Sequence, residues 1–187
     1  MSLTPAAERA KLEQLQSVFS DLFLSTYNTR LETGADEPFY QAATDRHEAV
    51  IYSRNDYLSS ALHEIAHWCI AGPERRLLDD YGYWYHADGR DQSAQHAFEQ
   101  VEVKPQAVEW ALSMALDHPF NLSADNLEQG SAPSPAFSAA VTLQLQRYLT
   151  IGLPPRAQQL YDALVALSTA QAAQFRAAPE SNERVPC

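Results

Sequence analysis

Cysteine and long apolar runs are both scarce in this chain. Only two of its 187 residues are cysteines, Cys69 and Cys187, which are too few for a disulfide framework. No run approaches the roughly 18 consecutive apolar residues that a membrane-spanning helix needs. The sequence therefore excludes a disulfide-stapled scaffold and a membrane span, and it favours a reducing compartment.

Positive charge is also in short supply. The chain has 13 Lys and Arg residues against 24 Asp and Glu residues, and its formal net charge is −11. An acidic surface repels phosphate backbones. Residues 1–5 lack the basic region and following apolar stretch of a secretory signal. We therefore expect a cytoplasmic protein that has neither a nucleic-acid nor a membrane partner.

The remaining composition is that of an ordinary globular domain, with 45% hydrophobic and 20% charged residues. Thr4 is the predicted N-cap of the first helix, and Asn55-Asp56 that of the second. A further helical face runs through Phe98 and Leu112, and Pro105 either starts or kinks that helix. The apolar spacing places the first two helices over residues 4–27 and 57–71, and it predicts two more over 136–151 and 156–175.

Signals for extended structure are few. The β-branched run over residues 49–52 predicts a short strand, whereas 28–46 carries the breakers Gly34, Asp36 and Pro38. Residues 81–85 are aromatic and extended in character, and Asp88-Gly89 predicts a hairpin turn. We expect an α+β fold: a mainly helical single domain over 1–176 with a small central sheet, followed by a flexible polar tail over 177–187.

The most informative stretch is His63-Glu64-Ile65-Ala66-His67, which fits the pattern H-E-x-x-H inside a predicted helix. Residues four apart on a helix lie on one face, so both imidazoles can reach one metal ion. The flanking residues are mostly apolar, and two buried histidines without partners are costly. The pattern predicts a metal site; the alternative is a pair of core histidines that hydrogen-bond to the backbone.

Two histidines need at least one further ligand. The candidates are Glu99, Glu102 and Glu109, and we favour Glu102 because it falls just before Pro105, where the chain direction is most constrained. His86 or His96 are substitutes. Two histidines and one carboxylate suit Zn²⁺ in metallopeptidases and Fe²⁺ in oxygen-activating enzymes, and ligand type alone does not separate the two. With zinc, Glu64 would be the general base.

Longer and more specific strings surround this motif: His63-Glu64-Ile65-Ala66-His67-Trp68-Cys69-Ile70-Ala71-Gly72, Tyr81-Gly82-Tyr83-Trp84-Tyr85, Asp88-Gly89-Arg90-Asp91 and Val101-Glu102-Val103-Lys104-Pro105-Gln106-Ala107. These strings resemble the bacterial elongation factor P hydroxylase family. The resemblance covers most of the chain and weakens after about residue 130.

The resemblance implies a specific reaction. The family hydroxylates one lysine side chain of elongation factor P after that lysine has received a β-lysyl group, in chemistry similar to that of iron monooxygenases. It implies His63, His67 and Glu102 as ligands of Fe²⁺, with Zn²⁺ as the alternative, dioxygen as co-substrate and elongation factor P as partner. It implies that the catalytic residue Glu64 lies beside the ligands and orients a ligand or a proton. The helix also looks like that of a zincin peptidase, in which this glutamate is the base. The alternatives are a zinc metallopeptidase and a non-catalytic module with a structural metal.

The aromatic, acidic segment after the motif is the candidate substrate-binding region. Tyr83 and Tyr85 are candidates for the wall of a channel for a long cationic side chain, since aromatic faces attract ammonium groups. Asp88 and Asp91, with Asp79 and Asp80 upstream, are candidates to receive its amines. The alternative is an ordinary packed hairpin with a solvated acidic loop.

Overall fold

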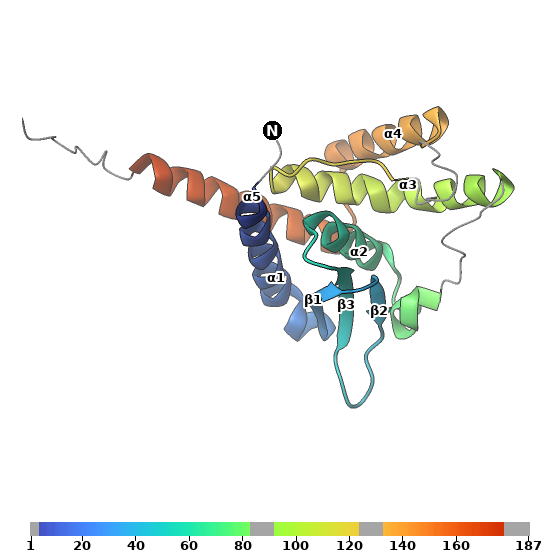
Figure 1. Cartoon of the computed structure of the whole chain (residues 1–187), viewed down its shortest axis with the longest axis horizontal. Helices are drawn as coiled ribbons and strands as arrows, with labels where there is room; N and C mark the ends of the chain where they lie inside the picture. Colours follow the sequence, from blue (N-terminus) through green and yellow to red (C-terminus); the bar gives the residue numbers. More distant parts are fainter. Residues whose placement is uncertain (1–3, 83–91, 124–132, 178–187) are drawn as a thin grey trace, which may run out of the picture.

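Five helices and three short strands make up the described fold (Figure 1). The computed structural model describes residues 4–82, 92–123 and 133–177. The candidate substrate-binding residues Tyr83, Tyr85, Asp88 and Asp91 lie outside these ranges, as do His86, the predicted hairpin turn and the tail from 178 onward. A mainly helical domain with a small sheet is therefore confirmed, whereas the likeness to zincins stays a prediction.

Helix α1 (Pro5–Tyr27) begins where the sequence predicts. The Thr4 hydroxyl accepts a hydrogen bond from Ala7 N at 3.3 Å, and Asn28 ends the helix in the left-handed conformation at φ 48°. One side of α1 is fully buried and forms part of the main core, through Leu12, Leu15, Val18, Phe19 and Phe23.

The sheet has the strand order β1-β3-β2, and the sequence patterns do not predict β1 and β2. β1 (Thr29–Ala35) runs parallel to β3 (Ala49–Arg54), and β2 (Phe39–Gln41) pairs antiparallel with β3. Gly34, read as a breaker, has φ 87° and lies where the β1–β3 register shifts between Glu32 and Ala35. A bulge thus accommodates the glycine inside a strand. The predicted strand at 49–52 is confirmed as β3.

Helix α2 (Leu58–Ile70) carries the histidine motif, but its predicted cap is wrong. Tyr57 is the N-cap and makes no side-chain capping bond, while Asn55 forms the preceding turn at φ 48°. Glu8 of α1 accepts from Leu58 N at 3.4 Å instead. A tertiary contact therefore satisfies an end of the helix that the local sequence leaves open.

Two short 3₁₀-helices follow, η1 (Arg75–Leu77) and η2 (Asp79–Gly82). The expectation of extended structure is wrong for its described part, because Tyr81 and Gly82 belong to η2, where Asp80 and Tyr81 have positive φ. Asp80 and Asp79 accept hydrogen bonds from the N–H groups of Tyr40 and Ala42, each at 2.9 Å. These carboxylates thus bind the backbone of strand β2 and its continuation.

Helix α3 (Gln92–Ala115) continues through Pro105, so the helix does not start at the proline. The helix ends before the predicted Pro119, where Asp117 takes φ 47° and His118 N bonds to Ser113 O at 2.9 Å. α4 (Pro135–Ile151) and α5 (Pro155–Ala177) confirm the last two predicted helices to within two residues at each end.

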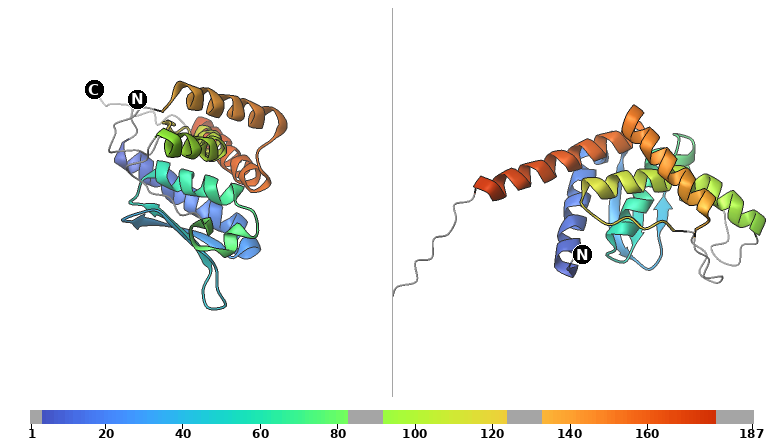
Figure 2. Two further views of the ribbon diagram at one scale, coloured as in Figure 1. Left: turned by 90° about the vertical axis from the view of Figure 1, so that its right-hand side faces the viewer. Right: turned by 90° about the horizontal axis from the view of Figure 1, so that it is seen from above.

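The elements stack in layers, which Figure 2 shows from the side. α1 and α2 cover one face of the sheet, α3 and α5 lie over them, and α4 packs on the outside of α3. The α3–α4 contact has its own small core, formed by Ala107, Ala111, Phe137, Val141 and Leu145. The layer of α2 against α3 is the one that builds the site. No helix within the described ranges is long and apolar enough to cross a membrane.

Candidate metal centre

His63 and His67 lie one turn apart on α2 and face the same space. Their Nε2 atoms are 3.0 Å apart and their rings 4.6 Å apart, in an edge-to-face arrangement. The rest of the helix explains this direction, because its apolar residues pack into the main core, whereas both histidines stay partly exposed. The alternative of two histidines bonded to the backbone is wrong, since the described contacts of both rings are to side chains.

Glu102 of α3 brings a carboxylate to the same two nitrogens. Its Oε1 lies 3.3 Å from His67 Nε2 and its Oε2 lies 3.8 Å from His63 Nε2. One donor atom from each of the three residues lies within 4.8 Å of the others. Two donors each about 2.1 Å from a shared ion are at most about 4.2 Å apart, so these separations fit a metal ion between the three side chains.

Glu109 binds the back of the first histidine. Its Oε2 accepts a hydrogen bond from Nδ1 of His63 at 2.8 Å, and the carboxylate is buried. Glu102 and Glu109 are seven residues apart, two helical turns, and so share one face of α3. This contact holds the His63 ring and leaves Nε2 toward the other donors, an arrangement that metal-binding histidines usually show.

Glu99, the third candidate ligand, has a different task. Its two carboxylate oxygens accept from Ser134 N at 3.2 Å and from the Ser134 hydroxyl at 2.7 Å. Ser134 in turn caps α4 by accepting from Phe137 N. Glu99 is therefore buried at the start of α4, where it joins that helix to α3.

Gln106 is a site residue that the sequence reading did not single out. Its side chain is 1% exposed, and its amide exchanges two hydrogen bonds with the Ser123 backbone, at 2.8 and 3.1 Å. These two bonds define which end of the amide is nitrogen. The same Nε2 lies 3.4 Å from Glu102 Oε2, at the long limit of a hydrogen bond. The only sequence signal is its place four residues after Glu102, on the same helical face.

The charges of this cluster favour a cation. Burial lowers the pKa of His63, but the hydrogen bond and charge of Glu109, together with Glu102 and Glu64, outweigh it and raise the pKa to about 10. Burial, and then the charge of His63, hold the pKa of His67 well below its usual value. In the metal-free protein at neutral pH, His63 is therefore a positively charged imidazolium and His67 is neutral.

Glu64 is placed to hold or release a proton. Burial raises its pKa to about 7, although the positive charge of His63 opposes the shift. A carboxyl group with such a pKa exchanges a proton near neutrality, which suits general acid–base work.

The remaining sequence candidates lie elsewhere. Cys69 is buried in the main core, and burial raises the pKa of its thiol to about 12, which keeps it neutral. His96 is exposed on α3 and contacts Gln100. Neither of these side chains belongs to the group of three donors.

The end of α2 is held by arginines. Nη2 of Arg156, on α5, donates to the carbonyls of Trp68, Cys69 and Ala71 at 2.6 to 3.1 Å. Arg76 adds a bond to Ala71 O at 2.8 Å. Positive charge at the C-terminal end of a helix is favourable, so these contacts stabilise the turn that carries His67.

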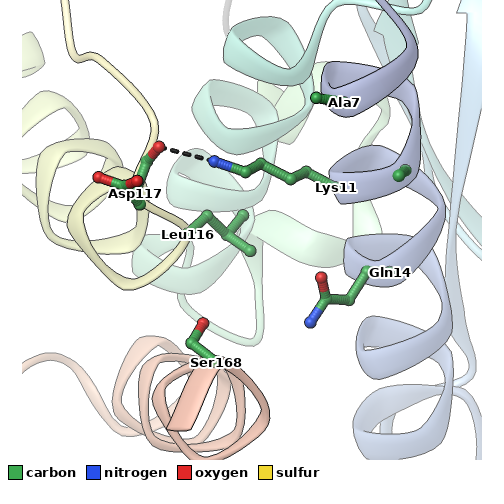
Figure 3. A pocket seen from close by; sticks show the side chains of 7 residues that line it. Ala7, Lys11, Gln14, Leu116, Asp117 and Ser168 are labelled. Carbon is green, nitrogen blue, oxygen red and sulfur yellow. Dashed lines mark hydrogen bonds between the residues drawn. The ribbon is translucent and has the colours of Figure 1, made fainter. Parts of the chain in front are cut away.

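A pocket on another part of the molecule is separate from this centre. It lies between α1, the end of α3 and α5, and Lys11 crosses it to donate to Asp117 O at 2.7 Å (Figure 3). Its lining contains neither the histidines nor the glutamates of the metal centre. Lys11 here binds a carbonyl at the end of α3, which is a capping contact.

A protein-family model described as elongation factor P hydroxylase matches residues 18–177, a range that contains α2 and α3 entirely. The elongation factor P lysine hydroxylase of Haemophilus influenzae is 49% identical over 158 residues, which are 83% of this chain and 88% of that protein.

Proposed function

The chain belongs to the elongation factor P hydroxylase family, and from this premise we propose that it hydroxylates the β-lysylated lysine side chain of elongation factor P in an iron-dependent, monooxygenase-type reaction. The observation that carries the proposal is the convergence of His63, His67 and Glu102 on one point between α2 and α3. Two histidines and one carboxylate leave several positions on a metal open, as oxygen-activating Fe²⁺ sites require.

His63 and His67, through Nε2, and Glu102, through its carboxylate, would hold the metal. When bound, ferrous iron supplies the dioxygen activation that hydroxylation of a carbon–hydrogen bond requires. Glu109 orients the His63 ring through Nδ1, and Gln106 Nε2 approaches Oε2 of the Glu102 carboxylate. The protein thereby sets the direction of its donor atoms before any metal enters.

Glu64 has a proton-handling role in this proposal. Its carboxyl group lies next to His63 in the sequence and has a pKa of about 7, so it can accept or return a proton at neutral pH. In a zinc peptidase the same glutamate is the general base of hydrolysis. The effect of removing its charge therefore separates the two reaction classes.

The substrate side chain is long and cationic, and the enzyme is acidic. A chain of net charge −11 attracts a basic partner surface, and screening limits that attraction to roughly 8 Å at 0.15 M salt. Tyr83, Tyr85, Asp88 and Asp91 remain our proposed substrate-binding residues. They follow directly on η2 in the sequence and precede the helix that carries Glu102.

The test uses the purified protein with ferrous iron, a reductant and oxygen. We expect β-lysylated elongation factor P to gain the mass of one oxygen atom, and the unmodified factor and a His67→Ala variant to give no gain. A metal-loaded wild-type enzyme that adds no oxygen contradicts the proposal. Cleavage of the factor or of a general peptide substrate would favour the peptidase instead.

A further inference from the structure

The two histidines of the metal centre differ in how their rings are held. Glu109 accepts a hydrogen bond from Nδ1 of His63 at 2.8 Å and fixes that ring directly. Among the residues that the structure describes, no hydrogen bond reaches Nδ1 of His67, whose polar contacts are made through Nε2. A metal-binding histidine usually has a partner on its other nitrogen. The direction of the His67 ring therefore depends on the backbone turn that carries it.

That turn is the last one of α2, and the end of a helix is where its backbone opens most readily. The carbonyls of a final turn have no partner within the helix, so they need bonds from elsewhere. Ala71 N closes the turn by donating to His67 O at 2.9 Å. The carbonyls of Trp68, Cys69 and Ala71 share one side-chain donor. Nη2 of Arg156, near the start of α5, donates to all three at 2.6, 3.1 and 2.6 Å.

Arg156 also contacts the side chain of the residue that follows His67. Its guanidinium carbon lies 4.5 Å from the centre of the Trp68 ring and 5.3 Å from that of Tyr27. The Trp68 ring is fully buried and packs against three aromatic rings of α1. One guanidinium thus contacts both the backbone oxygen and the ring of Trp68, which fixes the main chain next to His67.

The placement of Arg156 costs free energy that α5 does not return. Its Nε is buried without a hydrogen bond, and no carboxylate within the described ranges forms an ion pair with it. A cation near the start of a helix also meets the positive end of that helix's dipole. The three hydrogen bonds of Nη2 all go to the end of α2. The end of α2 therefore explains the position of this side chain.

We propose that Arg156 is a positioning residue of the metal centre: it holds the last turn of α2, so that Nε2 of His67 keeps its direction toward the other two donors. It supports His67 through the backbone, whereas Glu109 supports His63 by a direct bond. The inference rests on the proposed metal site. α5 thereby contributes to that site although it carries none of the three donors.

Two methionine variants test the proposal. Arg156→Met removes the donors but keeps a long side chain, and we expect the dissociation constant for Zn²⁺, measured by competition with a chelator, to rise at least about tenfold. Lys11→Met is the matched control, since it removes a similar contact at the end of α3, the bond to Asp117 O at 2.7 Å. Its dissociation constant should stay within about twofold of wild type, although its midpoint of thermal unfolding falls.

A spectroscopic measurement separates positioning from stability. The visible absorption of bound Co²⁺ depends on the geometry of its ligands. At saturation, Arg156→Met should give a band that differs from that of wild type, whereas Lys11→Met should give the wild-type band. Arg156→Gln keeps an amide donor on a shorter side chain, and it takes the place of Arg156→Met in both measurements if Arg156→Met does not fold.

Each outcome decides. Wild-type affinity for Zn²⁺, or a wild-type Co²⁺ band, in a folded Arg156 variant overturns the inference while the proposed function stands. An equal loss of affinity in Lys11→Met also overturns it, because general destabilisation would then explain the effect. Both measurements use the metal alone, so they judge the inference whether or not the enzyme hydroxylates elongation factor P. If the wild-type protein binds neither metal, the proposed metal site fails and the inference fails with it.

Discussion

Oε2 of Glu109 lies 2.8 Å from Nδ1 of His63, on the ring edge opposite to the nitrogen that faces His67. This one contact orients the imidazole and raises its pKa, and it keeps the proton on Nδ1 when Nε2 loses its own. The three glutamates of α3 each have a different set of partners. Glu102 faces the histidine nitrogens, Glu109 supports His63 from behind, and Glu99 anchors α4.

The first prediction concerns the ligand set. His63→Ala or His67→Ala removes one of three donors, and Glu102→Gln replaces the charged donor with a neutral amide, so metal content measured by elemental analysis should fall to near zero while far-ultraviolet circular dichroism keeps its helical signal. Glu99→Gln is the control, because it should retain the metal and instead lower thermal stability through a weaker bond to Ser134. Full metal content in either histidine variant would refute the site.

The support of His63 is tested separately. Glu109→Gln keeps the shape of the side chain but removes the charge that binds Nδ1, and we expect metal affinity to fall about 10- to 100-fold. The affinity is measured by competition with a coloured chelator. A loss as complete as that of Glu102→Gln would instead make Glu109 a ligand.

Metal binding should depend on pH with a definite sign. The metal-free site holds a proton on His63, whose pKa is about 10, and the metal requires Nε2 without its proton. Binding therefore releases one proton, and apparent affinity should rise by up to about tenfold per pH unit between about pH 7 and pH 9. His67 adds nothing to this slope, because its lowered pKa leaves it neutral throughout.

Calorimetric titration with Zn²⁺ in two buffers of different ionisation enthalpy counts the released protons. Glu109→Gln removes the carboxylate that does most to raise the pKa of His63, so it should release fewer. An affinity that does not change with pH in the wild-type protein would show that His63 is neutral in the metal-free site.

Glu64 distinguishes hydroxylation from hydrolysis. Because it is not among the three converging donors, Glu64→Gln should keep the metal and lower hydroxylation less than loss of a histidine does. In a zinc peptidase the same substitution removes the general base and is about as harmful as loss of the metal. Peptide hydrolysis by the wild type that stops in Glu64→Gln would establish the peptidase reading.

Some of this structure follows from short-range sequence patterns. The cap and apolar stripe of α1 lie within one helix, and the pair His63 and His67 shares a face because residues four apart on a helix do so in any fold. The apolar spacing within α4 and α5 likewise predicts both helices without any tertiary contact. By contrast, the sequence does not predict β1 and β2, because an isolated glycine such as Gly34 usually interrupts a strand. Only the pairing of β1 with β3 shows that Gly34 occupies a bulge inside the strand.

The sequence by itself determined the helix with its two histidines, because periodicity is a local property of the chain. It also indicated that a carboxylate would come from the stretch of Glu99, Glu102 and Glu109, but helical spacing does not say which face of α3 meets α2. Only the packing of α3 between α2 and α4 decided that, since it turns Glu102 and Glu109 toward the histidines and Glu99 toward Ser134. The cap of α2 by Glu8 and the bonds from Arg156 to its last carbonyls likewise depend on contacts between residues far apart in the chain, which no local pattern encodes.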